Sequence, residues 1–181
     1  MDPLQLAARI DATCRLTGSF TLRSGATATE YFDKYRFESD PALLRAVAEA
    51  MVPLLPPGTG VLGGLELGGV PIATVVSSLT GLPVVFVRKQ AKEYGTRRLV
   101  EGADVDGAVI TLVEDVLTTG GAAREATLAL RGLGARVGTA VCAIDRSGLD
   151  GGPLLDVDVA TRSVLTRADL DAARAARDRS R

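Results

Sequence analysis

Runs of consecutive apolar residues constrain the fold of this chain more than any other feature. Four of them are predicted to be buried strands: residues 60–64, 84–87, 108–113 and 137–144. A strand with one face in water alternates apolar and polar residues, whereas a continuous run fits a parallel strand that is covered on both faces. Segments with helical spacing, residues 71–79 and 121–133, lie between these runs. The alternation predicts an α/β fold with an open, mainly parallel sheet.

Other segments are predicted to be helices that lie before, within and after this alternation. Asp40 and Pro41 are the residue types typical of an N-cap and of a first helical turn, so a helix is expected to begin there. We expect an N-terminal helix over residues 4–16, followed by an irregular or extended stretch. The end of the chain is predicted to be an amphipathic helix over residues 165–179, with Thr166 as its cap.

The length of the chain favours one domain. With 181 residues, of which 46% are hydrophobic, the chain can bury one substantial core. No internal repeat or low-complexity linker divides it. We therefore expect a single domain with the following parts: residues 1–38 as an N-terminal helix and flanking segment, 39–165 as the α/β core, and 166–181 as a C-terminal helix.

The charge pattern argues against nucleic acid and membrane partners. The 21 basic and 22 acidic side chains are interspersed and give a formal net charge of -1, so no basic surface for nucleic acid is indicated. No apolar stretch approaches the roughly 20 residues that span a bilayer, and no signal-like segment begins the chain. We expect a cytoplasmic protein whose partners are small soluble molecules.

The chain contains no histidine, which limits the chemistry that it can perform. Ser-His-Asp and Cys-His nucleophilic sites are excluded, and so are most zinc sites. The two cysteines, Cys14 and Cys142, are too few for a disulfide framework. Catalysis would have to use carboxylates, lysine, arginine, backbone dipoles or a hard metal ion.

Two acids follow the apolar run at residues 108–113. Glu114 and Asp115 fall where that strand is expected to end, and ligands of open parallel sheets bind at the carboxyl ends of the strands. Residues 118–121, TTGG, then lead into a helix whose backbone N–H groups can surround a phosphate. Carboxylates beside a phosphate site suit a sugar phosphate, since they accept hydrogen bonds from hydroxyls and favour a hard divalent cation nearby. The alternative is that the acids only end a strand and start a helix.

The stretch VITLVEDVLTTGGAA, residues 109–123, closely resembles the phosphoribosyl diphosphate (PRPP) signature of type I phosphoribosyltransferases. The resemblance implies their fold, a central mainly parallel sheet flanked by helices, with a small hood from the N-terminal segment and a flexible charged loop. It also implies Mg²⁺, held mainly by PRPP and water near the two acids, with no direct protein ligand expected. The implied PRPP-binding residues of this stretch are Glu114 and Asp115 for the ribose hydroxyls, then Val116, Leu117, Thr118, Thr119, Gly120, Gly121 and Ala122, of which residues 118–122 hold the 5'-phosphate.

Residues 86–95, FVRKQAKEYG, resemble the R-K-x-x-K-x-H-G segment of orotate phosphoribosyltransferases. Arg88, Lys89 and Lys92 would bind the diphosphate of PRPP on a loop that closes over it, neutralising the charge that builds as its bond to the sugar breaks. With Asp115, they are the expected catalytic residues. The family usually has histidine where this chain has Tyr94. Taken alone, the segment would fit a charged surface hairpin equally well.

The segment GSFTLRSG, residues 18–25, and the loop around Gly68 extend the resemblance. Arg23 stands where some family members have a lysine that approaches the reacting centre, and arginine keeps the charge but does not carry protons in the same way. Tyr31 and Phe32 fall where the family often has aromatic residues beside the flat base. Gly68 stands where some members have a lysine, in a loop that holds the diphosphate partly through backbone amides.

Arg146, in the segment AIDR, matches an arginine that the family carries to the orotate carboxylate. A planar guanidinium binds a carboxylate through two hydrogen bonds and would select an acidic pyrimidine over uracil. A surface salt bridge is the alternative for a lone arginine after a strand. The orotate-binding residues that the resemblance implies are Arg23, Tyr31, Phe32, Thr118 and Arg146.

These features predict an orotate phosphoribosyltransferase, which transfers phosphoribosyl from PRPP to orotate and releases diphosphate and orotidine 5'-phosphate in pyrimidine biosynthesis. Family members are typically homodimers, so we expect a homodimer in which the loop 88–98 reaches the neighbouring site. Two alternatives remain open. One is a phosphoribosyltransferase for another nucleobase, and the other is a non-catalytic protein of the same fold that senses PRPP or nucleotides.

Overall fold

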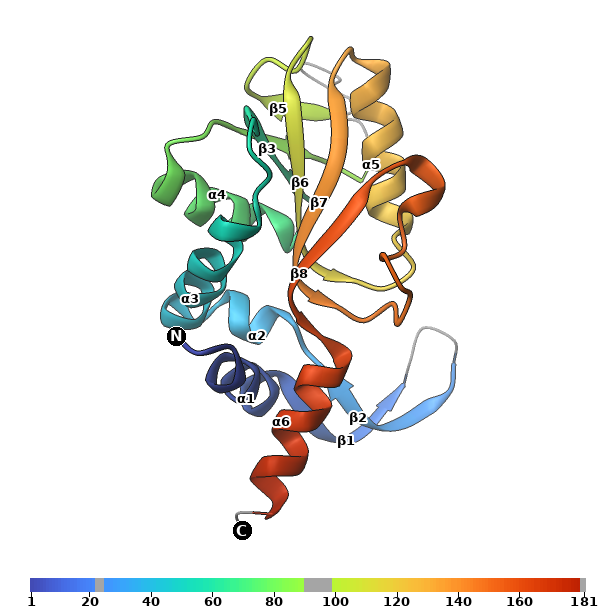
Figure 1. Cartoon of the computed structure of the whole chain (residues 1–181). Coiled ribbons are helices and arrows are strands. Elements are labelled where there is room, and N and C mark those ends of the chain that lie inside the picture. The colour runs from blue at the N-terminus through green and yellow to red at the C-terminus, as the bar shows by residue number, and fades with distance from the viewer. Residues whose placement is uncertain (22–24, 90–98, 180–181) are drawn as a thin grey trace.

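The computed structural model describes residues 1–21, 25–89 and 99–179 (Figure 1). Its centre is a six-stranded sheet in the order β5-β4-β3-β6-β7-β8. The strands are β3 (Val61–Leu65), β4 (Val84–Val87), β5 (Val100–Gly102), β6 (Val109–Leu117), β7 (Arg136–Asp145) and β8 (Ala160–Thr166). Neighbouring strands are parallel except β4 and β5, which are antiparallel. The mainly parallel sheet predicted from the apolar runs is confirmed.

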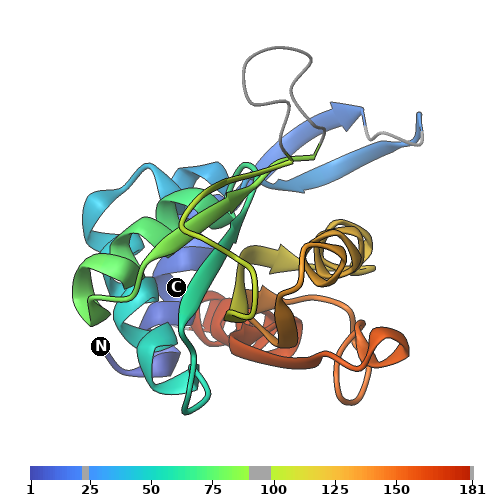
Figure 2. The same cartoon turned by 90° about the horizontal axis from the view of Figure 1, so that it is seen from above.

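Helices cover both faces of this sheet (Figure 2). On one face lie α1 (Pro3–Cys14), α3 (Pro41–Met51) and α4 (Gly69–Thr80), and on the other lies α5 (Gly121–Gly132). The remaining helical segments are α2 (Tyr35–Glu38), η1 (Val52–Leu54), η2 (Leu155–Val157) and α6 (Arg167–Arg179). The start of α3 is as predicted, because Asp40 accepts hydrogen bonds from the backbone N–H groups of Ala42 and Leu43 at 2.9 and 3.1 Å.

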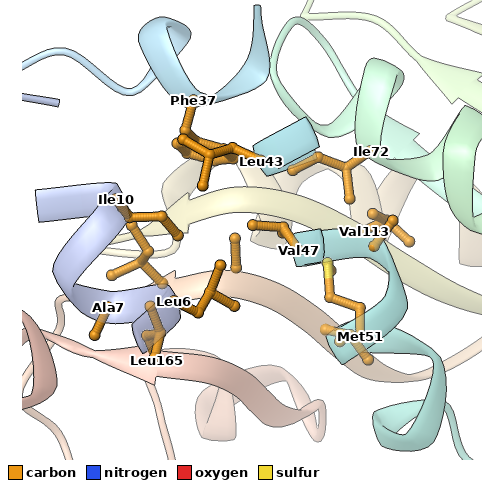
Figure 3. Close-up of a cluster of buried hydrophobic side chains, with 14 of the residues drawn as sticks. Leu6, Ala7, Ile10, Phe37, Leu43, Val47, Met51, Ile72, Val113 and Leu165 are labelled. Atoms are coloured by element: carbon orange, nitrogen blue, oxygen red, sulfur yellow. The ribbon is translucent and has the colours of Figure 1, made fainter. Parts of the chain in front are cut away.

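Alternate residues of the central strands serve two hydrophobic cores. In β6, Leu112 packs on the α5 side and Val113 on the side of α3 and α4. Figure 3 shows the second of these cores, in which side chains of α1, α3 and α4 meet those of the sheet, with the fully buried Phe37 at one edge. This burial on both faces explains why the strands read as continuous apolar runs.

Two of the boundaries that differ from the sequence prediction concern the site and the first helix. β6 does not end before Glu114, because it stays paired with β7 through Leu117 and Asp145, although its pairing with β3 stops at Val113. The acids therefore lie inside the strand, where its pairing with β3 has ended. The first helix ends at Cys14 and not at Leu16, because the chain turns extended at Arg15 and pairs with a second strand.

The C-terminal part contains a strand that the sequence did not predict. Residues 160–166 form the edge strand β8, and Leu165 belongs to it and not to the following helix. Thr166 caps α6 as predicted. Its hydroxyl accepts a hydrogen bond from the backbone N–H of Asp169 at 3.3 Å, while the Asp169 carboxylate accepts one from the backbone N–H of Thr166 at 2.7 Å.

A two-stranded antiparallel hairpin, β1 (Arg15–Thr21) and β2 (Thr27–Phe32), lies below the sheet in Figure 1, at the end where β8 runs into α6. This is the side of the carboxyl ends of the parallel strands. The hairpin therefore occupies the position expected of a hood over the site.

Ion pairs fasten the hairpin to α1 and α6. Arg174 of α6 holds the Glu30 carboxylate with two hydrogen bonds of 2.6 and 2.9 Å. Arg15 contacts Glu30 at 3.3 Å and the fully buried Asp11 at 2.7 Å, and Arg177 also contacts Asp11 at 3.1 Å. Because Asp11 is buried, its two arginines hold the three elements in a fixed arrangement.

Candidate active site

Two buried carboxyl groups form the centre of the site. Asp115 is fully buried and Glu114 is 7% exposed. The Asp115 carboxylate accepts a hydrogen bond from the backbone N–H of Val116 at 2.6 Å and lies 2.5 Å from the ammonium group of Lys34. Glu114 Oε1 accepts a hydrogen bond from the backbone N–H of Asp115 at 3.2 Å. Both side chains are thus fixed before any ligand arrives.

The pKa values of the two acids are shifted in opposite directions. Burial, together with the neighbouring Asp115 carboxylate, raises the pKa of Glu114 well above its usual value. Burial alone would also raise the pKa of Asp115, but hydrogen bonds with Glu114 and Glu38 and the contact with Lys34 outweigh burial and lower it. Glu114 therefore holds a proton more tightly than an ordinary glutamate, whereas the negative charge of the pair is favoured on Asp115.

Gly68 allows the loop between β3 and α4 to lie directly against these acids. A Cβ atom at Gly68 would stand only 1.8 Å from Asp115 Oδ2 and 2.6 Å from Glu38 Oε1. At Gly69, a Cβ atom would stand 2.2 Å from the carbonyl oxygen of Val113 in β6. These glycines are required by close approach of the loop to β6 and not by an unusual backbone conformation.

The loop between β6 and α5 has the form of an anion site. Gly120 adopts a left-handed conformation (φ 74°), and no side chain caps the start of the 12-residue α5. Thr118, Thr119 and Ala122 are exposed around this helix start. The unpaired backbone N–H groups and the helix dipole favour a phosphate here.

The end of β4 brings two predicted cations close to this helix start. Arg88 and Lys89 line a pocket of about 100 Å³ together with Glu66, Ala122 and neighbouring residues of α5. Glu66 holds this arrangement, because its carboxylate accepts a hydrogen bond from the backbone N–H of Lys89 at 3.0 Å. Lys92, the third predicted cation of the segment, lies outside the described residues.

Arg146 follows the end of β7, beside the end of β6 and the loop that leads to α5. Its backbone N–H donates a hydrogen bond to the carbonyl of Leu117 at 2.8 Å, and its guanidinium lies 5.2 Å from the centre of the Phe32 ring. A hood residue and a core residue that were both predicted to bind the base are thus brought together. Tyr31 is next to Phe32 on β2, but its ring packs 5.5 Å from that of Phe20. Arg23 lies outside the described residues.

Lys34 and Glu38 were not identified from the sequence, although both contact the central acids. They stand one helical turn apart, at the start and the end of α2, and Glu38 shares the surroundings of Asp115. Burial, and then Asp115, raise the pKa of Glu38 to about 8. The spacing of a lysine and an acid directly after the aromatic pair was the available signal, but it is common on helix surfaces.

A larger pocket of about 800 Å³ lies elsewhere, between β5, the loop that follows it and α5. Its lining is mostly apolar, with Asp104 and Asp106, and it includes none of the predicted site residues. It therefore does not suit a phosphate ligand. In the part of the chain that the structure describes, no group of three or more His, Cys, Asp or Glu side chains is arranged to hold a metal ion. Within the same ranges, none of the helices has the length and apolar character to cross a membrane.

The sequence and the fold match known proteins over most of the chain. Residues 38–156 match the phosphoribosyl transferase domain family. The orotate phosphoribosyltransferase of Nocardioides sp. is 68% identical over 171 residues, which cover 94% of this chain and 96% of that protein. The orotate phosphoribosyltransferase of Halobacterium salinarum is 43% identical over 155 residues, with 84% and 87% of the two chains covered.

Solved structures share the arrangement of elements. The Mycobacterium tuberculosis H37Rv orotate phosphoribosyltransferase in complex with Fe(III) dicitrate superimposes with a TM-score of 0.84 at 32% identity, covering 94% of this chain and 99% of that one. The same Mycobacterium tuberculosis enzyme in complex with PRPP gives a TM-score of 0.77 at 29% identity, with the same coverage.

Proposed function

The chain belongs to the orotate phosphoribosyltransferase family, a family of pentosyltransferase enzymes of pyrimidine biosynthesis, and we propose that the cleft around Glu114 and Asp115 is where it transfers phosphoribosyl from PRPP to orotate. The whole chain would act as one catalytic domain. The observation that carries this proposal is the position of the ionised Asp115 between the uncapped start of α5 and the loop at Gly68.

In this reaction N1 of orotate forms a bond to the anomeric carbon of PRPP and loses its proton to solvent or to the diphosphate, while the bond from that carbon to diphosphate breaks. The sugar becomes cation-like as its bond to diphosphate breaks, so the protein needs no nucleophile of its own. It has to hold the reactants in line, stabilise the leaving group and exclude water. The absence of histidine from the sequence is consistent with that demand.

The proposed roles follow the chemistry of each group. Asp115 and Glu114 accept hydrogen bonds from the ribose hydroxyls, and the raised pKa of Glu114 favours a proton there that it can donate. The backbone N–H groups of residues 118–122 bind the 5'-phosphate at the start of α5, with Val116 and Leu117 leading into that loop. We assign Thr118 a contact with the base as well as with the phosphate, because it is the exposed first residue of that loop.

We assign the diphosphate to the cations after β4. Arg88 and Lys89 line the pocket next to Ala122, which brings them close to the proposed phosphate site at the start of α5. Lys92 completes this group in the proposal. Cationic groups there stabilise the negative charge that grows on the departing diphosphate.

The base is assigned to the space between the hood and Arg146. The Arg146 guanidinium would bind the orotate carboxylate with two hydrogen bonds, and Phe32 would lie against the flat ring. Burial, and then the nearby cations Arg167 and Arg15, lower the pKa of Arg146, so an anion is favoured at this point. Tyr31 and Arg23 complete the proposed set from the hood.

Mg²⁺ is the proposed cofactor, held by PRPP and water. The donor set fits this cation, because the carboxyl groups of Asp115 and Glu114 offer hard oxygen atoms that accept hydrogen bonds from metal-bound water. Bound Mg²⁺ supplies positive charge to the diphosphate. We further propose a cytoplasmic homodimer in which the loop 88–98 reaches the partner's site.

The direct test follows orotate by its absorbance, in the presence of PRPP and Mg²⁺, with uracil, adenine and hypoxanthine as parallel substrates. We expect turnover of orotate alone. Turnover of another base without orotate would replace the substrate assignment, and no turnover of any base would favour a sensor of PRPP or nucleotides.

A further inference from the structure

Lys34 makes a contact that the roles above do not use. Its ammonium lies 2.5 Å from Asp115 Oδ2, although the two residues come from distant parts of the sequence. The Lys34 side chain is 33% exposed, whereas Asp115 is fully buried. A lysine side chain is usually hydrated, so placing the Lys34 ammonium beside a buried carboxylate costs hydration that the ion pair has to offset.

Asp115 has more acidic neighbours than basic ones. Glu114 precedes it on β6, and Glu38 approaches it from α2 so closely that one Cβ atom at Gly68 would touch both carboxyl groups. Asp33 adds a further acid near Glu38. Among the described residues, Lys34 is the one cation that forms an ion pair with Asp115. Without Lys34, the carboxyl groups of Glu38, Glu114 and Asp115 would lie together with no positive charge beside them. Their mutual repulsion would then favour the protonated form of Asp115.

The local fold sets the place of Lys34 firmly. It precedes the first turn of α2, where its carbonyl accepts a hydrogen bond from the backbone N–H of Phe37 at 3.2 Å. The Phe37 ring is fully buried in the core between α1, α3 and the sheet. The Lys34 ammonium also lies 5.3 Å from the centre of the Tyr35 ring. The start of α2, between the hood and the core, therefore holds the Lys34 ammonium beside Asp115 in one defined position.

We propose that Lys34 is a positioning residue of the transfer reaction, which holds the Asp115 carboxylate ionised and in place to accept hydrogen bonds from the ribose hydroxyls of PRPP. The inference rests on the proposed function, because it assigns Lys34 a task in PRPP binding. It also gives the segment after the hood a part in the chemistry. Lys34 acts through Asp115 and not by contact with the diphosphate.

The test is a double-mutant cycle on PRPP binding, measured by calorimetry with Mg²⁺. Lys34→Met should weaken PRPP binding by about 10- to 100-fold, the range expected for hydrogen bonds to a charged group. In an Asp115→Asn background, the same change should have almost no further effect, because the carboxylate that Lys34 serves is gone. Arg36→Met removes an exposed cation two residues away and is the matched control, with wild-type binding expected.

The pH profile supplies a readout that a purely structural role would not change. In Lys34→Met, Asp115 should keep a proton to higher pH beside Glu38 and Glu114, so kcat/KM for PRPP should rise with pH through the neutral range. Lys34→Arg keeps the cation and should retain the wild-type profile. Thermal melting of each variant separates loss of fold from loss of binding, and Lys34→Arg provides the comparison if Lys34→Met does not fold.

Each outcome decides between two accounts. Equal losses of PRPP affinity from Lys34→Met in both backgrounds would mean that Lys34 contacts PRPP directly, and this result would overturn the inference. Unchanged PRPP binding in the single variant Lys34→Met would overturn it as well. Wild-type protein that binds PRPP but turns over no base would refute the proposed function while leaving the binding cycle intact. Wild-type turnover together with an unaffected Lys34→Met variant would refute only the role of Lys34.

Discussion

Gly68→Ala is the substitution whose consequence follows most directly from the geometry. The new Cβ atom would stand 1.8 Å from Asp115 Oδ2, while ordinary contacts begin at 3.4 Å. The Asp115 carboxylate would have to retreat by roughly 1.6 Å, since α4 follows immediately and limits movement of the loop. Asp115 is short, buried and held by Val116 and Lys34, so it has little freedom to adjust.

A displacement of this size should chiefly affect PRPP. Misplacing a catalytic group by about 1 Å costs on the order of 100-fold in rate, and we expect a loss of that order in kcat/KM for PRPP. Overpacking itself should lower the stability of the fold by about 1–3 kcal/mol, which leaves a folded protein for the assay. Steady-state rates at saturating orotate and urea unfolding curves measure the two effects separately.

Gly132→Ala is the matched control. Gly132 is the last residue of α5, and no atom lies within 4 Å of the position that a Cβ atom would take there. The same methyl group should leave kcat/KM unchanged at this position and raise stability by about 0.5–1 kcal/mol. Wild-type kcat/KM for PRPP in Gly68→Ala would show that the position of Asp115 does not govern PRPP use, and the assignment of this acid would be wrong.

Three further predictions follow. Arg146→Ala should raise the KM for orotate by roughly 10- to 100-fold with little change in the KM for PRPP, and a normal orotate KM would remove its role. Lys92→Ala should lower turnover strongly without changing the melting temperature, so an unchanged rate would exclude this residue from the mechanism. In the folded protein Glu38 keeps its proton up to about pH 8, whereas in the unfolded chain it loses it near 4.5. The free energy of unfolding should therefore decrease as the pH rises from about 4.5 to about 8. Urea unfolding at pH 5 and at pH 8 should show a smaller decrease for Glu38→Gln than for the wild type. Equal losses in both proteins would show that Glu38 is ionised.

The sheet was accessible from the sequence because strands buried on both faces consist of consecutive apolar residues. The start of α3 was equally accessible, since Asp40 and Pro41 are local signals that need no tertiary contact. The edge strand β8 was missed because ATRSVLT mixes polar and apolar residues, and its pairing depends on β7. A local sequence pattern is weak evidence for a strand whose formation depends on hydrogen bonds to a neighbouring strand.

The site residues likewise separate into those with a local sequence signal and those that depend on tertiary contacts. The glycine turn that starts α5 could be predicted because its residues are consecutive and its signal is local, while its binding of the 5'-phosphate stays a prediction. The end of β6 was placed too early, because two charges resemble the end of a strand, while the pairing with β7 carries the strand through them. Lys34 and Glu38 reach Asp115 only through the packing of α2, and no sequence pattern specifies such a long-range contact.

A crystal structure of the protein with PRPP and Mg²⁺ is the most direct test of the central claim, that the acids of β6 and the loop before α5 divide one ligand between them. We predict that the ribose hydroxyls lie within hydrogen-bonding distance of Glu114 and Asp115, and that the backbone N–H groups of residues 118–122 hold the 5'-phosphate. A 5'-phosphate bound elsewhere, or ribose hydroxyls without contact to either acid, would contradict the account.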